Sequence, residues 1–163
     1  MKKIARFMKV SFEQYKESRG SDIDEETLKK EYDQIRLPQR ATSASAGYDF
    51  VVPFDVEIGT EPVLIPTGIR VPMWGCYFLM LVPRSGLGFK YGMRLKNTCG
   101  IIDADYVLAS NEGHIMCKVI SDTPFSLKAG DRFVQGIFIP YGISHNGNVT
   151  DARTGGMGST GLR

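Results

Sequence analysis

From residue 47 onward, short apolar runs alternate with turn-forming residues, and no other feature of the sequence constrains the fold as strongly. All 8 prolines lie at or after Pro38, and 17 of the 18 glycines follow residue 40. Many short strands at close spacing are typical of a β-sandwich or a β-barrel. The pattern therefore predicts a mainly β fold, with strands over Tyr48–Val52, Val63–Ile65, Ile69–Val71, Tyr77–Val82, His114–Ile120 and Phe133–Ile139.

The first 40 residues differ from the rest in charge, because they hold 10 of the 20 basic and 8 of the 18 acidic residues. Leu28, Tyr32 and Ile35 form one apolar stripe at helical spacing, and acidic residues precede them as at a helix N-terminus. We therefore predict a helix over about residues 22–36, which Pro38 terminates, and a strand over residues 4–12.

These patterns divide the chain into three parts. Residues 1–40 are predicted to form a strand-and-helix extension packed on a β domain that spans residues 41–143. Residues 144–163 are rich in Gly, Asn, Ser and Thr, and we expect a flexible C-terminal arm. A chain of 163 residues is about one domain, and it needs neither a metal nor a disulfide to fold.

Charge and hydropathy exclude several function classes. The net charge of +2 is too small for attraction of the whole surface to nucleic acid. No apolar run approaches the roughly 18 residues of a membrane-spanning helix, and Arg6 and Lys9 interrupt the start of the chain where a signal peptide needs an apolar stretch. We expect a cytoplasmic protein without nucleic-acid or membrane partners.

The cysteines and histidines predict neither a disulfide framework nor a zinc site. Cys76, Cys99 and Cys117 form no CxxC pair, which indicates reduced thiols. The two histidines, His114 and His145, lie far apart in the sequence. A zinc site is therefore not expected.

Two segments combine a charged residue with a glycine-containing turn. Asp49 follows Gly47 at the start of a predicted strand and is either a turn acid or a site residue. Arg84, Ser85 and Gly86 follow an apolar strand and are predicted to open a short helix. An arginine and a hydroxyl there suit phosphate oxygens, although a surface turn explains the same residues.

The segment 97–106 brings two acids close to apolar residues. On a strand or hairpin, Asp103 and Asp105 share one face. An acid near Ile101, Ile102 and Tyr106 is a candidate general base or hydroxyl acceptor, and a pair of acids can bind a hard cation. A hairpin with turn acids is the alternative interpretation.

Two further segments carry polar groups that a scaffold does not require. Gln135 lies inside a hydrophobic strand, so its amide needs either a structural partner or a polar ligand. Glycines and hydroxyls surround Arg153 in residues 153–161. That composition suits wrapping of phosphates by the backbone, or it belongs to a flexible end.

The order of these five segments, from Ala46 to Gly161, resembles that of the trimeric deoxyuridine triphosphate nucleotidohydrolases (dUTPases). The resemblance spans roughly 115 residues, and residues 1–40 are similar to an extension found in Firmicute and phage members. It implies a jelly-roll-like β-barrel that assembles into a homotrimer with active sites between subunits. It also implies hydrolysis of dUTP to dUMP and pyrophosphate, which limits uracil incorporation into DNA and supplies dUMP for dTMP synthesis.

The resemblance also assigns roles to residues. Asp103 would deprotonate the attacking water and accept a hydrogen bond from the sugar 3′-hydroxyl, while Tyr106 would exclude a 2′-hydroxyl. The hairpin that begins at Asn97 would read uracil, and Asp49 and Asp105 would support the site. The C-terminal arm, residues 144–163, would close over the bound nucleotide as a lid. The full substrate-binding set comprises Arg84, Ser85, Gly86, Asn97, Gly100, Ile101, Ile102, Asp103, Tyr106, Met116, Gln135, Arg153, Met157 and Gly158.

Mg²⁺ is the cofactor that the resemblance implies, held by the triphosphate and water without a direct protein ligand. Three departures from the family pattern stand out. Residues 107–112 form a longer hairpin tip, which is a candidate docking segment for a regulatory protein. Arg153 lies one residue closer to the glycine pair than usual, and Met157 replaces the Phe that usually stacks on uracil.

Two other functions compete with this interpretation. A dCTP deaminase of the same superfamily would need a catalytic Glu, for which Glu112 is the only acid near the required place. A barrel without catalytic activity could instead serve as a regulatory protein-binding module. The presence of Asp103, Arg84 and Arg153 favours the hydrolase.

Overall fold

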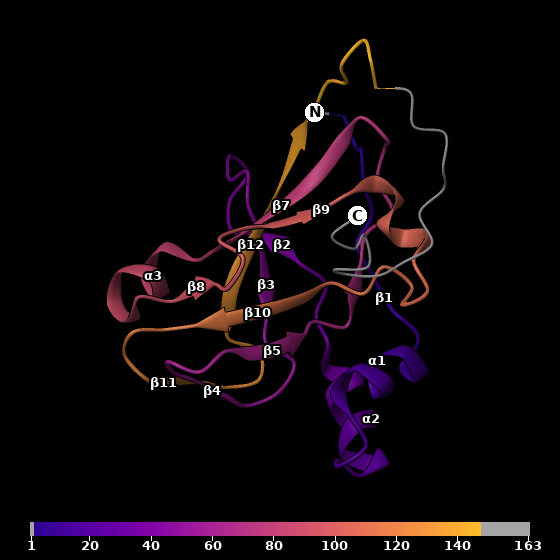
Figure 1. The fold of residues 1–163 in the computed structure, drawn as a ribbon. Coiled ribbons are helices and arrows are strands. Elements are labelled where there is room, and N and C mark those ends of the chain that lie inside the picture. Colours follow the sequence, from indigo (N-terminus) through magenta and orange to yellow (C-terminus); the bar gives the residue numbers. More distant parts are fainter. Residues whose placement is uncertain (1, 148–163) are drawn as a thin grey trace.

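The computed structural model describes residues 2–147 of the chain, and it is mainly β (Figure 1). The strands of the described part pair only in antiparallel fashion. This confirms the mainly β prediction. The strands belong to four separate sheets, and no closed ring of paired strands is formed by residues 2–147.

The largest sheet has five strands and carries most of the residues that matter below. Its order is β2 (Gln39–Arg40), β3 (Tyr48–Val51), β12 (Arg132–Pro140), β7 (Tyr77–Pro83) and β9 (Gly100–Ile102). β12 lies in the middle, and its Gln135 pairs with Asp49 of β3 on one side and with Val82 of β7 on the other. β2 brings residues 39 and 40 into this sheet, ahead of the β domain predicted to start at residue 41.

The remaining strands form three smaller sheets. One has three strands, β5 (Val63–Pro66), β10 (Met116–Ile120) and β8 (Arg94–Leu95), and the two others are the pairs β1 (Met8–Lys9) with β6 (Ile69–Arg70) and β4 (Val56–Ile58) with β11 (Phe125–Leu127). One apolar cluster joins the sheets, and it includes Phe50, Ile65, Leu81, Val119 and Phe133, each at most 1% exposed. Each such side chain contributes about 1.5–3 kcal/mol by leaving water.

The N-terminal extension contains two helices, α1 (Phe12–Arg19) and α2 (Glu25–Gln34), which lie together at one end of the molecule (Figure 1). The predicted helix over residues 22–36 is confirmed as α2, which Asp24 caps by accepting a 2.9 Å hydrogen bond from the Thr27 N–H. The predicted strand over residues 4–12 is confirmed in part, because Met8–Lys9 form β1 and Ala5 forms an antiparallel bridge with Met73, whereas Phe12 already begins α1. Ser11 instead caps α1 by accepting a hydrogen bond from the Gln14 N–H.

The extension is packed firmly on the β domain. Tyr15, Leu28 and Ile35 are at most 6% exposed and belong to the same core cluster as the sheets. Burial raises the pKa of Tyr15, so its hydroxyl stays protonated and donates to Glu31. Glu31 also accepts two hydrogen bonds from Arg19, at 2.8 and 2.9 Å, which join α1 to α2.

The segment after β9 is not the predicted hairpin. β9 ends at Ile102, and residues Ala104–Leu108 form a 3₁₀ helix, η1, in which the Tyr106 N–H binds the Asp103 carbonyl at 3.1 Å. Asp103 and Asp105 therefore do not alternate along a strand. The predicted longer hairpin tip at residues 107–112 is the end of η1 followed by turns.

Two simpler expectations can also be compared with the structure. Cys76, Cys99 and Cys117 are all free, as predicted. None of the helices in residues 2–147 is both long and apolar enough to cross a membrane.

Candidate active site

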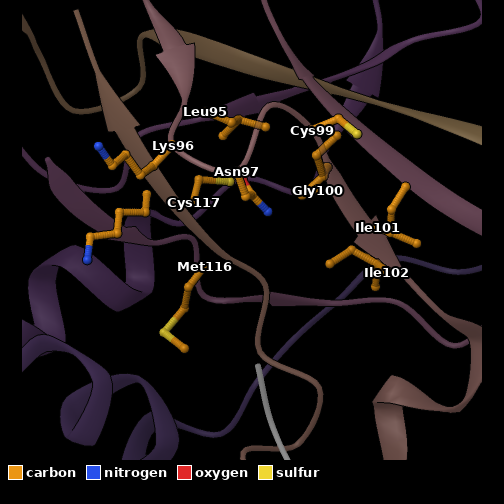
Figure 2. A pocket seen from close by; sticks show the side chains of 11 residues that line it. Leu95, Lys96, Asn97, Cys99, Gly100, Ile101, Ile102, Met116 and Cys117 are labelled. Carbon is orange, nitrogen blue, oxygen red and sulfur yellow. The ribbon is translucent and has the colours of Figure 1, made fainter. Parts of the chain in front are cut away.

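A pocket of about 440 Å³ opens beside the turn that connects β8 to β9 (Figure 2). This turn is tight, because Thr98 adopts a left-handed φ of 71° and its N–H binds the Leu95 carbonyl at 3.0 Å. Gly100 lets β9 approach β7, since a Cβ there would lie 3.1 Å from the Leu81 Cβ. β10 supplies the facing wall through residues 116–118.

Five of the residues predicted to bind the base line this pocket: Asn97, Gly100, Ile101, Ile102 and Met116. Asn97 and Met116 come from different elements, and Figure 2 shows both around the same hollow. The pocket thus offers one amide among mainly apolar walls, which is the usual composition of a small-molecule site.

Sequence reasoning missed several residues of the same wall. Lys96 and Cys99 lie in or beside the turn between β8 and β9. Lys118 lies two positions after Met116 in β10, which places both side chains on one face of the strand. Cys117 also lines the pocket, but burial raises the pKa of its thiol to about 12. It is therefore a neutral apolar contact and not a nucleophile.

A second pocket, of about 380 Å³, contains the candidate anion site. Asp49, Arg84, Ser85 and Gln135 all line it, although they are far apart in the sequence. Arg84 precedes the first turn of α3 (Ser85–Tyr91), the short helix that the sequence predicted. Gly86 is exposed in this turn and does not line the pocket.

Asp49 pairs with two arginines, of which Arg84 lines the second pocket and Arg132 lies outside it. Its carboxylate lies 3.2 Å from Nε of Arg84 and 3.1 Å from Nη1 of Arg132, and its side chain is only 13% exposed. Asp49 thus orients the guanidinium groups on either side of it. Arg132 was not among the predicted site residues, although it lies in the same segment as Gln135.

Gln135 reaches the second pocket because Gly47 leaves room for it. A Cβ on Gly47 would collide with Oε1 of Gln135. The pairing of Gln135 with Asp49 brings these two polar residues to the same level of the sheet. A side chain at position 47, two residues before Asp49, is therefore excluded because it would occupy the space of the Gln135 amide.

Asp103 and Asp105 lie just beyond the first pocket. Asp103 directly follows Ile102, which lines that pocket, and both acids are exposed. Tyr106 is 2% exposed, and its hydroxyl donates to the His114 carbonyl at 3.0 Å and accepts a 2.8 Å hydrogen bond from Asn111. The predictions for Arg153, Met157 and Gly158 concern residues outside the described part of the chain.

Glu112, the acid that a deaminase would need, is engaged elsewhere. Its carboxylate accepts hydrogen bonds from the N–H and the hydroxyl of Ser11 and lies 3.6 Å from Arg70. Within residues 2–147, no three His, Cys, Asp or Glu side chains converge as a metal-binding group.

Comparison with known proteins shows which family this chain is similar to. The family model described as dUTPase matches residues 33–161. The chain is 36% identical over 133 residues to the deoxyuridine 5′-triphosphate nucleotidohydrolase of Lactococcus lactis subsp. lactis (strain IL1403), with 78% of this chain and 89% of the relative covered. It is 39% identical over 139 residues to the enzyme of the same name from Desulfitobacterium hafniense (strain DSM 10664 / DCB-2), with 78% and 88% covered.

Solved structures give the same result. A dUTPase from Streptococcus mutans superposes with a TM-score of 0.62 at 38% identity, covering 70% of this chain and 91% of that one. A dUTPase from phage phi11 of S. aureus, described with a structural Mg(II) ion, also has a TM-score of 0.62 and covers 73% and 92%. At 20% identity, this second likeness concerns the fold alone. The sequence matches, together with the common fold, show that this chain belongs to the dUTPase family.

Proposed function

We propose that the pocket beside the β8–β9 turn binds the uracil of dUTP and that Asp103 activates the attacking water. As a dUTPase, the chain hydrolyses dUTP to dUMP and pyrophosphate. The observation that carries the site assignment is the pocket that Asn97, Ile102 and Met116 line together, because β9 runs from this pocket directly into Asp103. Its volume of about 440 Å³ suits a small-molecule ligand.

In the proposed reaction, Asp103 accepts a proton from a water molecule whose oxygen forms a bond to the α-phosphorus. The bond from that phosphorus to the oxygen bridging the α- and β-phosphates breaks, and pyrophosphate leaves with the electron pair. Catalysis of this type depends mainly on positioning and on neutralising charge. Asp103 also accepts a hydrogen bond from the sugar 3′-hydroxyl, and Tyr106 bounds the space beside the 2′ position.

The phosphates are proposed to bind at the second pocket of a neighbouring copy of the chain. Two observations support this division. No residue lines both pockets, and β9 and β3 are separated in the sheet by β7 and β12. Arg84, Ser85 and Gln135 then contact phosphates at this pocket, Gly86 follows Ser85 in the first turn of α3, and Asp49 orients Arg84. We accordingly propose a jelly-roll-like homotrimer, with a mass in light scattering of about three times the 18.1 kDa of one chain.

The residues present fit a Mg²⁺ ion carried by the substrate. Asp49 is paired with two arginines, so its carboxylate is suited to charge balance rather than to direct metal coordination. The ion would reduce the negative charge of the triphosphate, with phosphate oxygens and water as ligands. In the same proposal Arg153 contacts the γ-phosphate, and Met157 and Gly158 cover the base.

Pyrophosphate release from dUTP, dTTP, dCTP and UTP in the presence of Mg²⁺ tests the proposed site. We expect pyrophosphate release from dUTP alone. Asn97→Ala should raise the KM for dUTP, because uracil then loses a hydrogen-bond partner and the apolar walls of the pocket supply no other. The matched control is Asn146→Ala, at an exposed position outside both pockets. Equal effects of the two substitutions would refute the assignment.

The two alternative functions, a dCTP deaminase and a regulatory protein-binding module, predict different results. A deaminase would release ammonia from dCTP, and the engagement of Glu112 by Ser11 and Arg70 disfavours that reaction. A regulatory partner at residues 107–112 stays a proposal, which the 68% exposure of Leu108 supports. We also propose that the enzyme is located in the cytoplasm. The division of the chain into an extension (residues 1–40), a β domain (residues 41–143) and a C-terminal arm (residues 144–163) is likewise proposed.

A further inference from the structure

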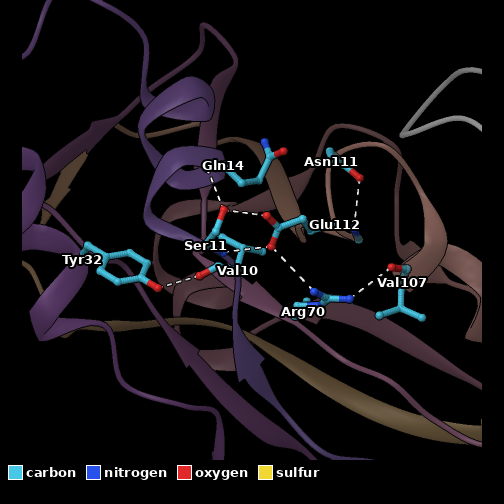
Figure 3. Close-up of polar contacts among 9 residues, drawn as sticks. Val10, Ser11, Gln14, Tyr32, Arg70, Val107, Asn111 and Glu112 are labelled. Carbon is cyan, nitrogen blue, oxygen red and sulfur yellow. Dashed lines mark hydrogen bonds and ion pairs between the residues drawn. The ribbon is translucent and has the colours of Figure 1, made fainter.

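Glu112 connects Ser11 of the N-terminal extension to the turn that follows η1 (Figure 3). Its carboxylate accepts hydrogen bonds from the Ser11 N–H at 2.9 Å and from the Ser11 hydroxyl at 2.5 Å, across 101 positions of sequence. The same hydroxyl oxygen caps α1 by accepting from the Gln14 N–H at 3.1 Å. Glu112 is therefore bound to the first turn of a helix.

Arg70 fixes Glu112 from the side of the β domain. Its Nη1 lies 3.6 Å from the Glu112 carboxylate, and its Nη2 donates to the Val107 carbonyl at 3.2 Å. Arg70 thus connects both ends of the segment 107–112. Because β1 pairs with β6 in the register Met8 to Arg70, the extension brings Ser11 close to this arginine.

The turn that ends at Glu112 also contacts the hydroxyl of Tyr106. Asn111 donates a 2.8 Å hydrogen bond to the Tyr106 hydroxyl, which in turn donates to the His114 carbonyl at 3.0 Å. Glu112 and Gly113 both adopt left-handed φ angles, 58° and 72°, so the backbone folds back sharply at this point. Tyr106 is bonded in turn to the Asp103 carbonyl through its own N–H at 3.1 Å.

A second contact binds the far half of α1 to the same turn. The Gly68 N–H donates to Nε2 of His114 at 2.8 Å, so the proton of the neutral ring lies on Nδ1 and is donated to the Ser18 hydroxyl at 3.0 Å. His114 is fully buried. Helix α1 therefore contacts residues 112–114 at Ser11 and again at Ser18.

From these contacts we propose that Glu112 is a positioning residue of the hydrolase, which couples α1 of the extension to the Asp103–Tyr106 segment. The inference rests on the proposed function, because it assumes that Asp103 acts on the attacking water. Without the bonds from Ser11, the turn keeps its exposed tip at Leu108 but is linked to α1 only by the contact between Ser18 and His114. A displacement of about 1 Å in a catalytic group can cost a hundredfold in rate.

The test compares Glu112→Gln with Glu31→Gln in the full-length protein. Glu31 is a matched control, because it is also a carboxylate that accepts several hydrogen bonds in the extension, yet its partners are Tyr15 and Arg19 and not the turn. We expect Glu112→Gln to lower kcat for dUTP by about tenfold to a hundredfold. Binding of the non-hydrolysable analogue dUpNHpp should change by less than threefold, since Glu112 does not line the first pocket.

Ser11 gives a second, milder test that does not depend on the folding of Glu112→Gln. Ser11→Ala should lower kcat severalfold, and Ser11→Thr, which keeps both the hydroxyl and the helix cap, should restore it. A merely structural role would lower the unfolding midpoint and leave kcat per folded enzyme unchanged in both Glu112→Gln and Ser11→Ala. That result would overturn the inference, as would an equal loss of kcat in Glu31→Gln.

The same kinetic assay includes Asp103→Asn, so that failure of the proposed base can be distinguished from failure of the positioning role of Glu112. Loss of activity in Asp103→Asn with normal kcat in Glu112→Gln and Ser11→Ala refutes the positioning role and leaves the proposed site intact. Full activity in Asp103→Asn refutes the proposed base, whatever the Glu112 variants do.

Discussion

Asp49 and Arg84 form an ion pair 3.2 Å long in the second pocket, although 34 residues separate them. The pair is partly buried, with 13% of the Asp49 side chain and 35% of the Arg84 side chain exposed. Asp49 also binds Arg132, which lies outside this pocket, so one carboxylate holds both Arg84 at the site proposed to receive phosphates and a second cation beside it. This arrangement gives Asp49 a role in positioning Arg84.

We therefore expect Asp49→Asn to weaken dUTP turnover by releasing Arg84. The asparagine keeps the shape of the side chain but removes the charge that orients the guanidinium group. A loss of about tenfold in kcat/KM, or about 1.4 kcal/mol, is expected. Steady-state kinetics measure it, with Asp55→Asn as the control, since Asp55 pairs with Lys128 on the surface. If both variants keep normal kinetics, Asp49 does not position Arg84.

The proposed base allows a sharper test. Asp103→Asn keeps the size of the side chain and removes its basicity, so kcat should fall by about 10²–10⁴. Affinity for dUpNHpp should change little, because the first pocket is unaltered. Asp33→Asn, in an exposed pair with Lys29, is the matched control. An Asp103→Asn enzyme that retains a tenth or more of normal turnover would contradict the assignment.

The sequence predicts some parts of this protein well for a physical reason. β7 and β12 appear as apolar runs between glycines and prolines, because their side chains are in or against the core and their ends turn sharply. Asn97, Gly100 and Met116 were assigned to one site from the family resemblance, and they do line one pocket. Local patterns of this kind are visible without knowledge of the fold.

Other features depend on distant partners and are invisible in the sequence. Helix α1 buries only Tyr15, so it shows no apolar stripe, and its first turn depends on a cap by Ser11. The bond from Ser11 to Glu112 joins positions 101 residues apart. The pairing of Asp49 with Arg132 follows from the register of β3 and β12, which alternation along either strand does not determine.

His114 makes folding stability depend on pH. Burial lowers its pKa to about 4, and the nearby charge of Glu112 offsets this only partly. The folded state holds the neutral ring, whose two nitrogens bond to Gly68 and Ser18. Because the folded pKa is depressed below the unfolded value of about 6.5, this stabilisation is complete above pH 6.5 and is lost as the pH falls towards 4.

We expect the free energy of unfolding to decrease by about 2 kcal/mol between pH 7 and pH 5 through this residue alone. Urea denaturation at the two values, at a fixed protein concentration, measures the change. His114→Gln should be less stable at pH 7 and should lose less stability on acidification. His145→Gln, at an exposed position, should behave like the parent protein. A pH dependence that is unchanged in His114→Gln would exclude this origin.

Gly113 and Gly130 provide a matched pair for testing how tightly the turn after η1 is packed. Both adopt left-handed φ angles, 72° and 92°, so an alanine is strained at either position. At Gly113 the new Cβ would lie 2.7 Å from the Val107 Cα and 2.8 Å from the Tyr106 carbonyl oxygen, which are backbone atoms. At Gly130 it would meet the end of the Arg36 side chain, which can move away.

Gly130→Ala should therefore cost about 1 kcal/mol in backbone strain together with the exposed hydrogen bond from Arg36 to the Gly130 carbonyl, whereas Gly113→Ala should cost at least about 1–2 kcal/mol more. Because the backbone that must shift at Gly113 belongs to Tyr106 and Val107, this variant should also lose turnover, measured well below its unfolding midpoint. Gly130→Ala should keep normal turnover, since its collision involves a side chain outside both pockets proposed to bind nucleotide. Equal stability and equal kcat in the two variants would show that the turn can move without disturbing the segment that carries Asp103.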